Sequence, residues 1–281
     1  MAAASTTITV LVENTAGRRG LLAEHGLAFW IERADRRILL DTGQGMALTH
    51  NARRLGVDLA AVTDVVLSHG HYDHTGGLET ILPHLAGAAV YAHLTALRDR
   101  FARDADGAVR PVGSPFGSLD RLRPQVGTLV PTRMQPVQPA DGVWLTGQIP
   151  RRNSFEDAGG AFYLDEACTE PDAVVDDQAL WLETSDGPVV LLGCAHAGVV
   201  NTLDYIRSLS GAGRIHAVLG GMHLLHADER RLRHTVAALR ELDVRHIGLA
   251  HCTGLEAMAR LYREIPGRCV HCTTGTRLEF P

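Results

Sequence analysis

Three histidines and one aspartate fall within six residues, where His69, His71, Asp73 and His74 form the pattern H-x-H-x-D-H. Neutral imidazoles at about 2.0–2.1 Å and a carboxylate oxygen at about 2.0–2.2 Å are ligands that Zn²⁺ takes in proteins. Alternate residues of an extended segment point the same way. We therefore expect His69 and His71 to hold one ion, while Asp73 and His74 face a second. A hydrogen-bonded, histidine-rich turn is the alternative, but four ligand-type residues at this spacing favour a metal site.

The elements around this cluster would place it at the end of a strand. Residues 64–71, DVVLSHGH, begin as an apolar strand that runs into the cluster. Gly70, Gly76 and Gly77 then allow the chain to turn tightly. The following residues, 77–85, are expected to form a helix. The pattern thus predicts metal ligands in a loop at the edge of a sheet.

Ligands from one loop rarely complete a metal site, because the donors must converge on the ion from several directions. Two further histidines, His196 in LLGCAHAG and His251 in IGLAHCTG, each close an apolar strand and precede a small, glycine-containing turn. Both are candidates for the missing ligands. A strand-end histidine that is hydrogen-bonded to the backbone is the alternative for each.

Strands and helices alternate in both halves of the chain, which favours an α/β fold. The first half predicts strands in 6–12, on both sides of 34–37, in 64–71 and in 88–93, with helices in 46–59 and 77–85. The second half predicts strands around 185–187, in 214–224 and in 244–252, with helices in 198–209, 228–242 and 254–265.

Residues 98–165 differ from both halves. They are rich in Gly, Pro and Arg and have poor periodicity. A long irregular segment is uncommon inside a compact domain and often borders a binding site. We expect it to be an insertion or lid within a single domain spanning residues 1–281.

Bulk composition limits the classes of function. With 45% hydrophobic and 21% charged residues, the sequence is typical of a soluble globular protein. A net charge of −5 without a Lys/Arg block gives no support to a nucleic-acid partner. No apolar stretch approaches the ~18 residues of a membrane-spanning helix. The start of the chain lacks signal-peptide features, and five cysteines show no disulfide framework, so we expect a cytoplasmic setting.

The H-x-H-x-D-H pattern, preceded by LLDTG at residues 39–43, resembles the metallo-β-lactamase superfamily. The further strings LLAEHGLAFWIE, GCAHAGVVNT, GGMHLL and AHCTG are similar to its 7,8-dihydropterin-6-methyl-4-(β-D-ribofuranosyl)aminobenzene-5′-phosphate synthase-like branch. This resemblance implies an α/β (α+β) fold, an αββα sandwich with a metal site at one edge of its two sheets. It implies one or two divalent transition-metal ions, with zinc favoured over manganese or iron.

The resemblance also assigns the strand-end histidines. His251 matches the last metal ligand of the superfamily, so we expect it beside Asp73 and His74. His196 is then expected with His69 and His71. These six residues are the predicted metal ligands.

One departure from the superfamily concerns the second half. Its hydrolases usually carry a G-H-T-x-G histidine and a G-D aspartate that bridges two metals, and neither string occurs in this sequence. Cys194 stands where the bridging aspartate would be, either as a thiolate ligand or as a small buried residue. Asp41, in LLDTG, is expected to orient a ligating histidine by accepting its distal N–H. Capping a turn is the alternative for Asp41.

Metal-assisted hydrolysis is the reaction that these residues favour. Asp73 would be the catalytic residue, both binding metal and orienting the attacking hydroxide. His25, His223 and Arg152 are candidates for binding a small phosphorylated or anionic substrate, and an ordinary surface or core role is the alternative for each. A phosphoester is the expected substrate, as in a phosphodiesterase. A transferase joining a pterin to an aminobenzene ribotide and a non-catalytic metal-bearing ligand-binding protein are the alternatives, and self-association is left open.

Overall fold

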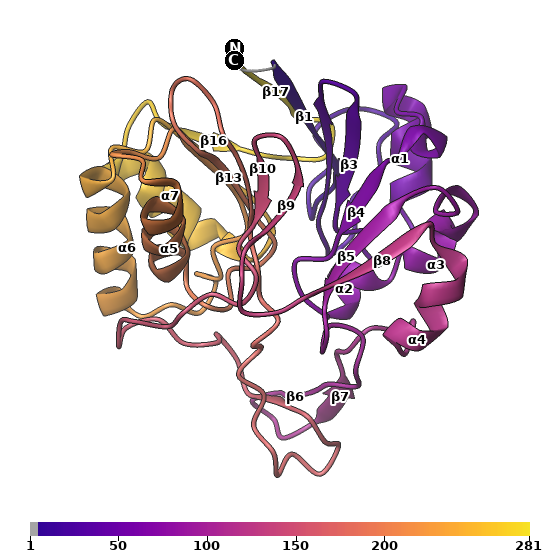
Figure 1. The fold of residues 1–281 in the computed structure, drawn as a ribbon. Helices are drawn as coiled ribbons and strands as arrows, with labels where there is room; N and C mark the ends of the chain where they lie inside the picture. Colours follow the sequence, from indigo (N-terminus) through magenta and orange to yellow (C-terminus); the bar gives the residue numbers. More distant parts are fainter. Residues whose placement is uncertain (1–4) are drawn as a thin grey trace.

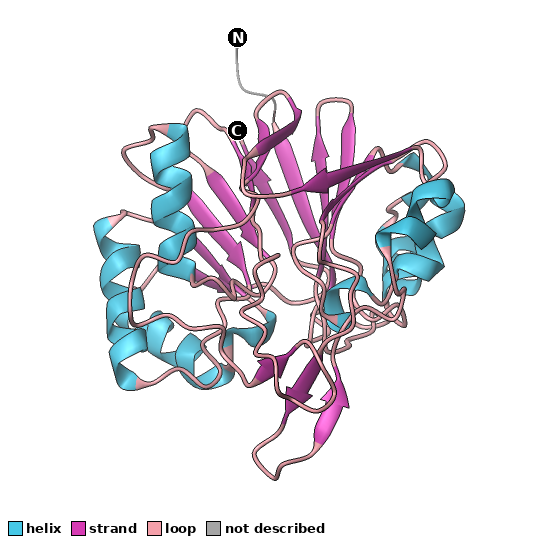
Figure 2. Ribbon diagram, turned by 60° about the horizontal axis from the view of Figure 1, so that its bottom comes forward, coloured by secondary structure: helices cyan, strands magenta, loops and turns pink. Residues whose placement is uncertain are grey.

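Two seven-stranded sheets face each other at the centre of the protein, and helices cover the outer side of each (Figures 1 and 2). The structure is a computed structural model that describes residues 5–281. The first sheet has the order β17-β1-β2-β3-β4-β5-β8. Its strands are β1 (Thr6–Val12), β2 (Ala28–Arg33), β3 (Arg36–Leu40), β4 (Asp64–Val66), β5 (Ala89–His93), β8 (Thr128–Thr132) and β17 (Arg277–Phe280).

The second sheet has the order β16-β15-β14-β13-β12-β10-β9. Its strands are β9 (Val137–Ala140), β10 (Val143–Leu145), β12 (Leu180–Leu182), β13 (Val189–Leu192), β14 (Ala217–Gly220), β15 (His246–Leu249) and β16 (Cys269–His271). Strands β13 to β16 are parallel, as are β3, β4, β5 and β8 of the first sheet. The carboxyl ends of neighbouring parallel strands meet at one edge of a sheet, and the functional side chains follow such ends.

Helices cover the outer faces in two groups. Against the first sheet lie α1 (Leu48–Leu55), α3 (Leu78–Ile81) and α4 (Leu119–Leu122), together with the 3₁₀ turns Leu59–Ala61, Leu82–His84 and Arg123–Gln125. The short α2 (Tyr72–Thr75) lies at the lower end of the strands (Figure 1). Against the second sheet lie α5 (Val199–Ser210), α6 (Glu229–Glu241) and α7 (Leu255–Glu264). The 3₁₀ turn His251–Thr253 directly precedes α7. None of the helices in residues 5–281 is long and apolar enough to cross a bilayer.

The alternation of side chains along the strands explains the layers. In β2, Phe29 and Ile31 pack between the sheets, while Trp30 packs against the helices of the first half. In β13, Leu191 lies between the sheets and Val190 packs against the helices of the second half. Strands buried on both faces read as continuous apolar runs, as in VVLL of β13. Three apolar layers result, which confirms the predicted αββα sandwich.

Residues 98–165 contribute to all three sheets of the structure. β8 extends the first sheet, and β9 and β10 form the end of the second. The strands β6 (Phe101–Arg103) and β7 (Val109–Pro111) pair with β11 (Phe162–Tyr163) in a small three-stranded sheet. Figure 2 shows this small sheet projecting below the open edge of the two large ones. Its function as a lid stays a prediction.

A buried ion-pair network ties the start of this segment to the chain before β12. Arg100 is 1% exposed and lies between two carboxylates, with Nη2 2.6 Å from Asp176 Oδ1 and Nε 3.4 Å from Asp172 Oδ2. A buried charge is tolerated only beside an opposite charge, because its hydration is lost. The pairing therefore connects the residue before β6 of the small sheet with the segment that leads into β12 of the second large sheet.

We expect Arg100→Met to lower the free energy of unfolding by about 3–5 kcal/mol, since two buried carboxylates lose their cation. Arg110→Met is the matched control, because Arg110 pairs with Asp104 in solvent and should cost only about 0–1 kcal/mol. Urea unfolding followed by circular dichroism measures both. Equal losses in the two variants would contradict the structural importance of the buried network.

Candidate metal centre

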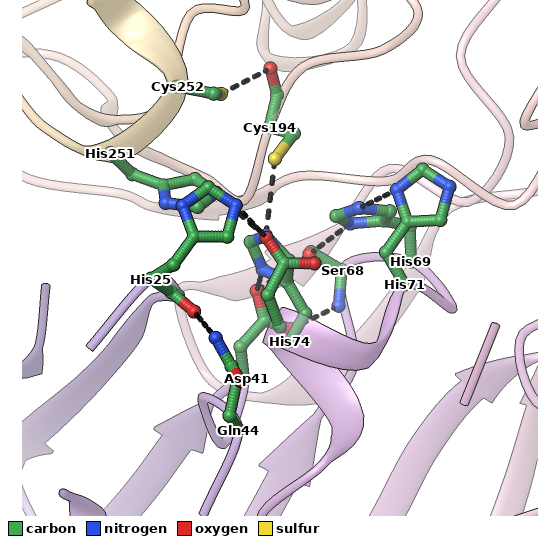
Figure 3. A network of polar contacts seen from close by, with 12 residues as sticks. His25, Asp41, Gln44, Ser68, His69, His71, His74, Cys194, His251 and Cys252 are labelled. Atoms are coloured by element: carbon green, nitrogen blue, oxygen red, sulfur yellow. Dashed lines mark hydrogen bonds and ion pairs between the residues drawn. The ribbon is translucent and has the colours of Figure 1, made fainter. Parts of the chain in front are cut away.

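The six predicted ligands converge at one edge of the sandwich. His69, His71, Asp73 and His74 lie in the loop after β4 and in α2. His196 follows β13 and His251 follows β15. Figure 3 shows the side chains of His69, His71, His74 and His251 around a common centre, into which Cys194 also points. Segments separated by more than a hundred residues thus supply a single cluster.

Four donor atoms form one half of this cluster. His74 Nε2 lies 3.1 Å from Cys194 Sγ, 3.3 Å from His251 Nε2 and 3.7 Å from Asp73 Oδ2. His251 Nε2 lies 3.3 Å from Asp73 Oδ2. Donors that share a tetrahedral ion at about 2.0–2.3 Å are separated by roughly 3.3–3.7 Å. These four separations are close to those between donors that share one tetrahedral ion.

The other half contains His69, His71 and His196. His69 Nε2 lies 3.1 Å from His71 Nδ1, and the rings of His69 and His71 lie 4.7 and 4.8 Å from that of His196. Ligand atoms of His69, His196 and Cys194 all lie within 4.8 Å of one another. The Nε2 atom of His196 is buried without a hydrogen-bond partner in the described chain, while its Nδ1 is bound to Ala158 O. Such an unpaired nitrogen fits a metal ligand.

Hydrogen bonds fix the tautomers of four of these histidines. Each Nδ1 faces an acceptor, which places the proton on Nδ1 and turns the Nε2 lone pair toward the centre. The acceptors are Ser68 Oγ for His69 (2.9 Å), Asp41 Oδ2 for His74 (2.7 Å), Ala158 O for His196 (2.7 Å) and Asn14 Oδ1 for His251 (2.9 Å). Neutral imidazoles with a free Nε2 are the form that binds metal.

Asp41 determines the hydrogen bonds of both His69 and His74. Its Oδ2 accepts from His74 Nδ1 and from Ser68 Oγ, each at 2.7 Å, and its Oδ1 accepts from the Ser68 backbone N–H at 2.7 Å. Because the Ser68 hydroxyl gives its proton to Asp41, it must accept from His69. One buried carboxylate thus orients His74 directly and His69 through Ser68.

Backbone strain accompanies this arrangement. Asp41, Ala195, His223 and His251 have φ between +50° and +60°, a region that non-glycine residues rarely adopt. Such conformations cost about 1–3 kcal/mol each and gather at functional sites, where surrounding contacts hold them. Four of the eight non-glycine residues with positive φ among residues 5–281 thus lie in or beside the cluster.

Burial and charge set the protonation of the cluster. Burial lowers the pKa of His69 and His196 well below the usual value and that of His71 to about 3. Burial also disfavours the charged form of His74, but the carboxylates of Asp41 and Asp73 outweigh it and raise its pKa to about 9. The histidines His69, His71 and His196 are therefore neutral. The carboxylates of Asp41 and Asp73 instead favour the protonated form of His74.

A cavity of about 500 Å³ opens onto this cluster. Its wall includes Phe162 and the guanidinium-bearing residues Arg103 and Arg110 of the small sheet. The ring of Phe162 packs against that of His71 at 4.8 Å. Cavities of about 300–1,000 Å³ suit small-molecule ligands. The volume and its charged wall are compatible with a small anionic compound.

The predicted substrate-binding residues have different positions. His25 and His223 line the cavity, with His25 Nε2 3.2 Å from Asp73 Oδ2 and the His223 ring 4.3 Å from that of His196. Arg152 does not line it. The side chain of Arg152 is exposed, and its backbone N–H donates to Asn201 Oδ1 on α5 at 2.8 Å, which holds it outside the cavity. Arg103 and Arg110 are the arginines that the fold brings to the cavity.

Several residues of the site were not predicted from the sequence, because no pattern distinguished them. Ser68 directly precedes the motif, so its position was the available clue. Asn14 approaches only through the fold, since the Asn14–His251 bond spans 237 residues. Phe162 and Arg103 come from the segment with poor periodicity, where nothing distinguished them from neighbouring residues.

Comparison with known proteins agrees with the fold and the motif. Residues 22–149 match the family model of the metallo-β-lactamase superfamily. The chain is 30% identical over 261 residues to the 7,8-dihydropterin-6-methyl-4-(β-D-ribofuranosyl)-aminobenzene-5′-phosphate synthase of Methanocaldococcus jannaschii, covering 89% of this chain and 88% of the synthase. The chain therefore belongs to the metallo-β-lactamase superfamily.

Solved structures extend the similarity. Tm1679, described as a metal-dependent hydrolase of the β-lactamase superfamily, has a TM-score of 0.81 and 29% identity, covering 98% of this chain and 99% of Tm1679. Zn²⁺-bound PqqB from Methylobacterium extorquens has a TM-score of 0.58 and 15% identity, covering 97% and 99% of the two chains. The likeness to PqqB is one of fold alone.

Asp41→Asn should weaken zinc binding about 10–100-fold, because a neutral amide holds the Nδ1–H of His74 less firmly. Titration against a chromophoric chelator measures the affinity. Asp64→Asn is the matched control, since Asp64 is a buried carboxylate at the opposite end of β4 and pairs with Arg36. Wild-type affinity in Asp41→Asn would show that Asp41 does not orient a ligand.

Proposed function

We propose that this protein is a metal-dependent hydrolase that cleaves a phosphoester of a small anionic molecule with water. The observation that carries the proposal is the convergence of donors from the first and second halves of the chain at the floor of a small-molecule cavity. The donors have ligand spacing, and four imidazoles have their tautomers fixed by hydrogen bonds. The Nε2 lone pairs of these histidines are thereby directed at a common centre, an arrangement that stabilises an ion and that an apolar core does not require.

The donor set fits divalent transition-metal ions. His69, His71 and His196 would hold one ion, and Asp73, His74 and His251 a second. Imidazole nitrogen and carboxylate oxygen suit zinc, and manganese or iron accept the same donors. Tm1679, a similar protein described as a metal-dependent hydrolase, supports this assignment. When bound, such ions lower the pKa of a coordinated water and polarise the substrate oxygen that gains charge.

The residues of the chain would then bind and orient the reactants. Asp73 presents a carboxylate oxygen that accepts a hydrogen bond from the attacking water. His25 lies 3.2 Å from that oxygen and can hold or transfer a proton at Nε2. Arg103 and Arg110, on the cavity wall, would bind the anionic part of the substrate, although Arg110 also pairs with Asp104. Phe162 packs over His71 and shields the cluster from bulk water.

Hydrolysis forms a bond between the water oxygen and phosphorus, while the bond to the leaving alcohol breaks and that oxygen gains a proton. His25 and His223 both line the cavity and are the groups available to supply this proton. Hydrolysis therefore needs no co-reactant besides water.

A second candidate is a transferase that joins a pterin to an aminobenzene ribotide. The 30% identity to the Methanocaldococcus jannaschii synthase favours it. The same cavity and cluster would serve. The aromatic amine would attack a carbon of the pterin that bears a pyrophosphate, so that a C–N bond forms, the bond to the pyrophosphate breaks and the pyrophosphate leaves. The two reactions differ in whether product forms without an amine acceptor.

Purified protein should carry about one to two transition-metal ions per chain. His71→Ala should lose most of them, because His71 is a buried donor of the group formed with His69 and His196. Elemental analysis measures this. His216→Ala is the control, since His216 lies beside His246, outside the cluster. An unchanged metal content in His71→Ala, with normal folding by circular dichroism, would contradict the assignment of the metal site.

Metal-loaded protein should hydrolyse a p-nitrophenyl phosphodiester without any amine present, and removal of metal with a chelator should abolish the activity. Absorbance of released nitrophenolate follows the reaction. Product that forms only with an aminobenzene ribotide would favour the transferase. Tight binding of a pterin or nucleotide would contradict both enzymes if no phosphoester or ester is turned over and no product forms with an aminobenzene ribotide present.

A further inference from the structure

Cys194 occupies the centre of the cluster. It follows β13 and is 3% exposed. Its Sγ belongs to the group formed with His69 and His196 and also to the group formed with His74 and His251. Among residues 5–281, no other side chain is shared by these two groups. Figure 3 shows the sulfur directed at His74, 3.1 Å from Nε2.

We propose that the Cys194 thiolate is a ligand shared by both ions of a two-ion centre. The inference rests on the proposed metal centre and specifies its composition. One ion would be held by His69, His71, His196 and the sulfur, and the other by Asp73, His74, His251 and the same sulfur. Each set has four protein donors, the number that zinc takes in tetrahedral sites.

An independent observation at His196 supports a cation beside this sulfur. The Nδ1 of His196 is bound to Ala158 O, so its lone pair resides on Nε2. That Nε2 is buried and has no partner within the described chain, and His196 belongs to the same ligand group as Cys194. A buried acceptor without a partner is costly. An ion between the nitrogen and the sulfur would remove this cost.

Charge also favours a thiolate at this position. Two divalent ions bring four positive charges into a buried site, and among the seven side chains of the two sets only Asp73 and Cys194 supply negative charge. A coordinating thiol loses its proton to solvent when metal binds. The sulfur thus adds the same charge as a bridging carboxylate and, as a softer ligand, favours zinc over manganese.

The backbone is built to bring this residue close to the motif. A Cβ at Gly193 would lie 2.0 Å from Ser68 Oγ and 3.1 Å from Asp41 Oδ2. Only glycine permits that approach between the end of β13 and the loop after β4. Position 194 is consequently the first residue of the second sheet that can place a side chain between the histidine groups.

Cys252 is the thiol that could be confused with Cys194. It is buried, and its Sγ faces the carbonyl oxygen of Cys194 at 3.6 Å (Figure 3). Its ligand group consists of Cys194 and His223 and includes neither His69 and His196 nor His74 and His251. The chain thereby offers a matched control, a second buried cysteine at the same cavity.

X-ray absorption at the zinc edge tests the sharing directly. Protein loaded with two zinc ions per chain should show about one sulfur per zinc at about 2.3 Å, because one sulfur serves both ions. A sulfur bound to only one of the two ions would give about half a sulfur per zinc. Cys194→Ser should remove the sulfur signal, and Cys252→Ser should leave it unchanged.

Cobalt(II) binding provides a second readout and covers a failure of Cys194→Ser to fold. Wild-type protein should bind two cobalt ions with a thiolate-to-cobalt charge-transfer band. Cys194→Asp should lose the band and keep both ions, since a carboxylate can take the bridging position. Loss of the band in Cys252→Ser, half a sulfur per zinc, or two ions without sulfur would overturn the shared thiolate while leaving the metal centre standing. Failure to bind any zinc or cobalt would overturn both.

Discussion

The buried carboxylate of Asp41 is the contact on which the site depends. It lies directly after β3 and receives hydrogen bonds from His74 and from both the backbone and the hydroxyl of Ser68, all at 2.7 Å. Through these bonds the first sheet fixes the direction of two imidazoles before any ligand arrives. Left-handed backbone at Asp41, which costs free energy, is retained because it turns the carboxylate toward the loop after β4.

The sandwich brings the remaining donors to this fixed loop. His196 and His251 follow parallel strands of the second sheet, whose carboxyl ends share the edge at which the first sheet presents its motif. The apolar layer between the sheets sets their separation, and Gly193 permits the closest approach of the two halves. A cluster of imidazole, carboxylate and thiol groups is thereby assembled by packing rather than by one local segment. The small sheet of β6, β7 and β11 adds the cavity wall, which makes the cluster a site for a small molecule.

The sequence allowed prediction of those residues whose position follows from local pattern. An apolar run that ends in His, Asp or Cys marks a strand end, and this rule located His69, His196, His251 and Asp41. The layered αββα fold was implied by the resemblance to the metallo-β-lactamase superfamily. It could not locate Asn14 or Ala158, because their hydrogen bonds to ligands depend on the packing of distant segments. Arg152 was expected at the cavity for its charge alone, and the bond of its backbone to Asn201 keeps it outside. The cavity residues Phe162, Arg103 and Arg110 could not be predicted, because they lie within residues 98–165. Short strands in a segment rich in Gly and Pro leave little periodicity.

The central claim is that two groups of donors hold metal on either side of Cys194, at the floor of the cavity. An anomalous-difference map from a zinc-loaded crystal, recorded on both sides of the zinc absorption edge, tests it most directly. The account predicts two peaks, one among His69, His71 and His196 and the other among Asp73, His74 and His251, with the Cys194 sulfur between them. A map without a peak at either group, or with zinc bound only elsewhere on the protein, would contradict it.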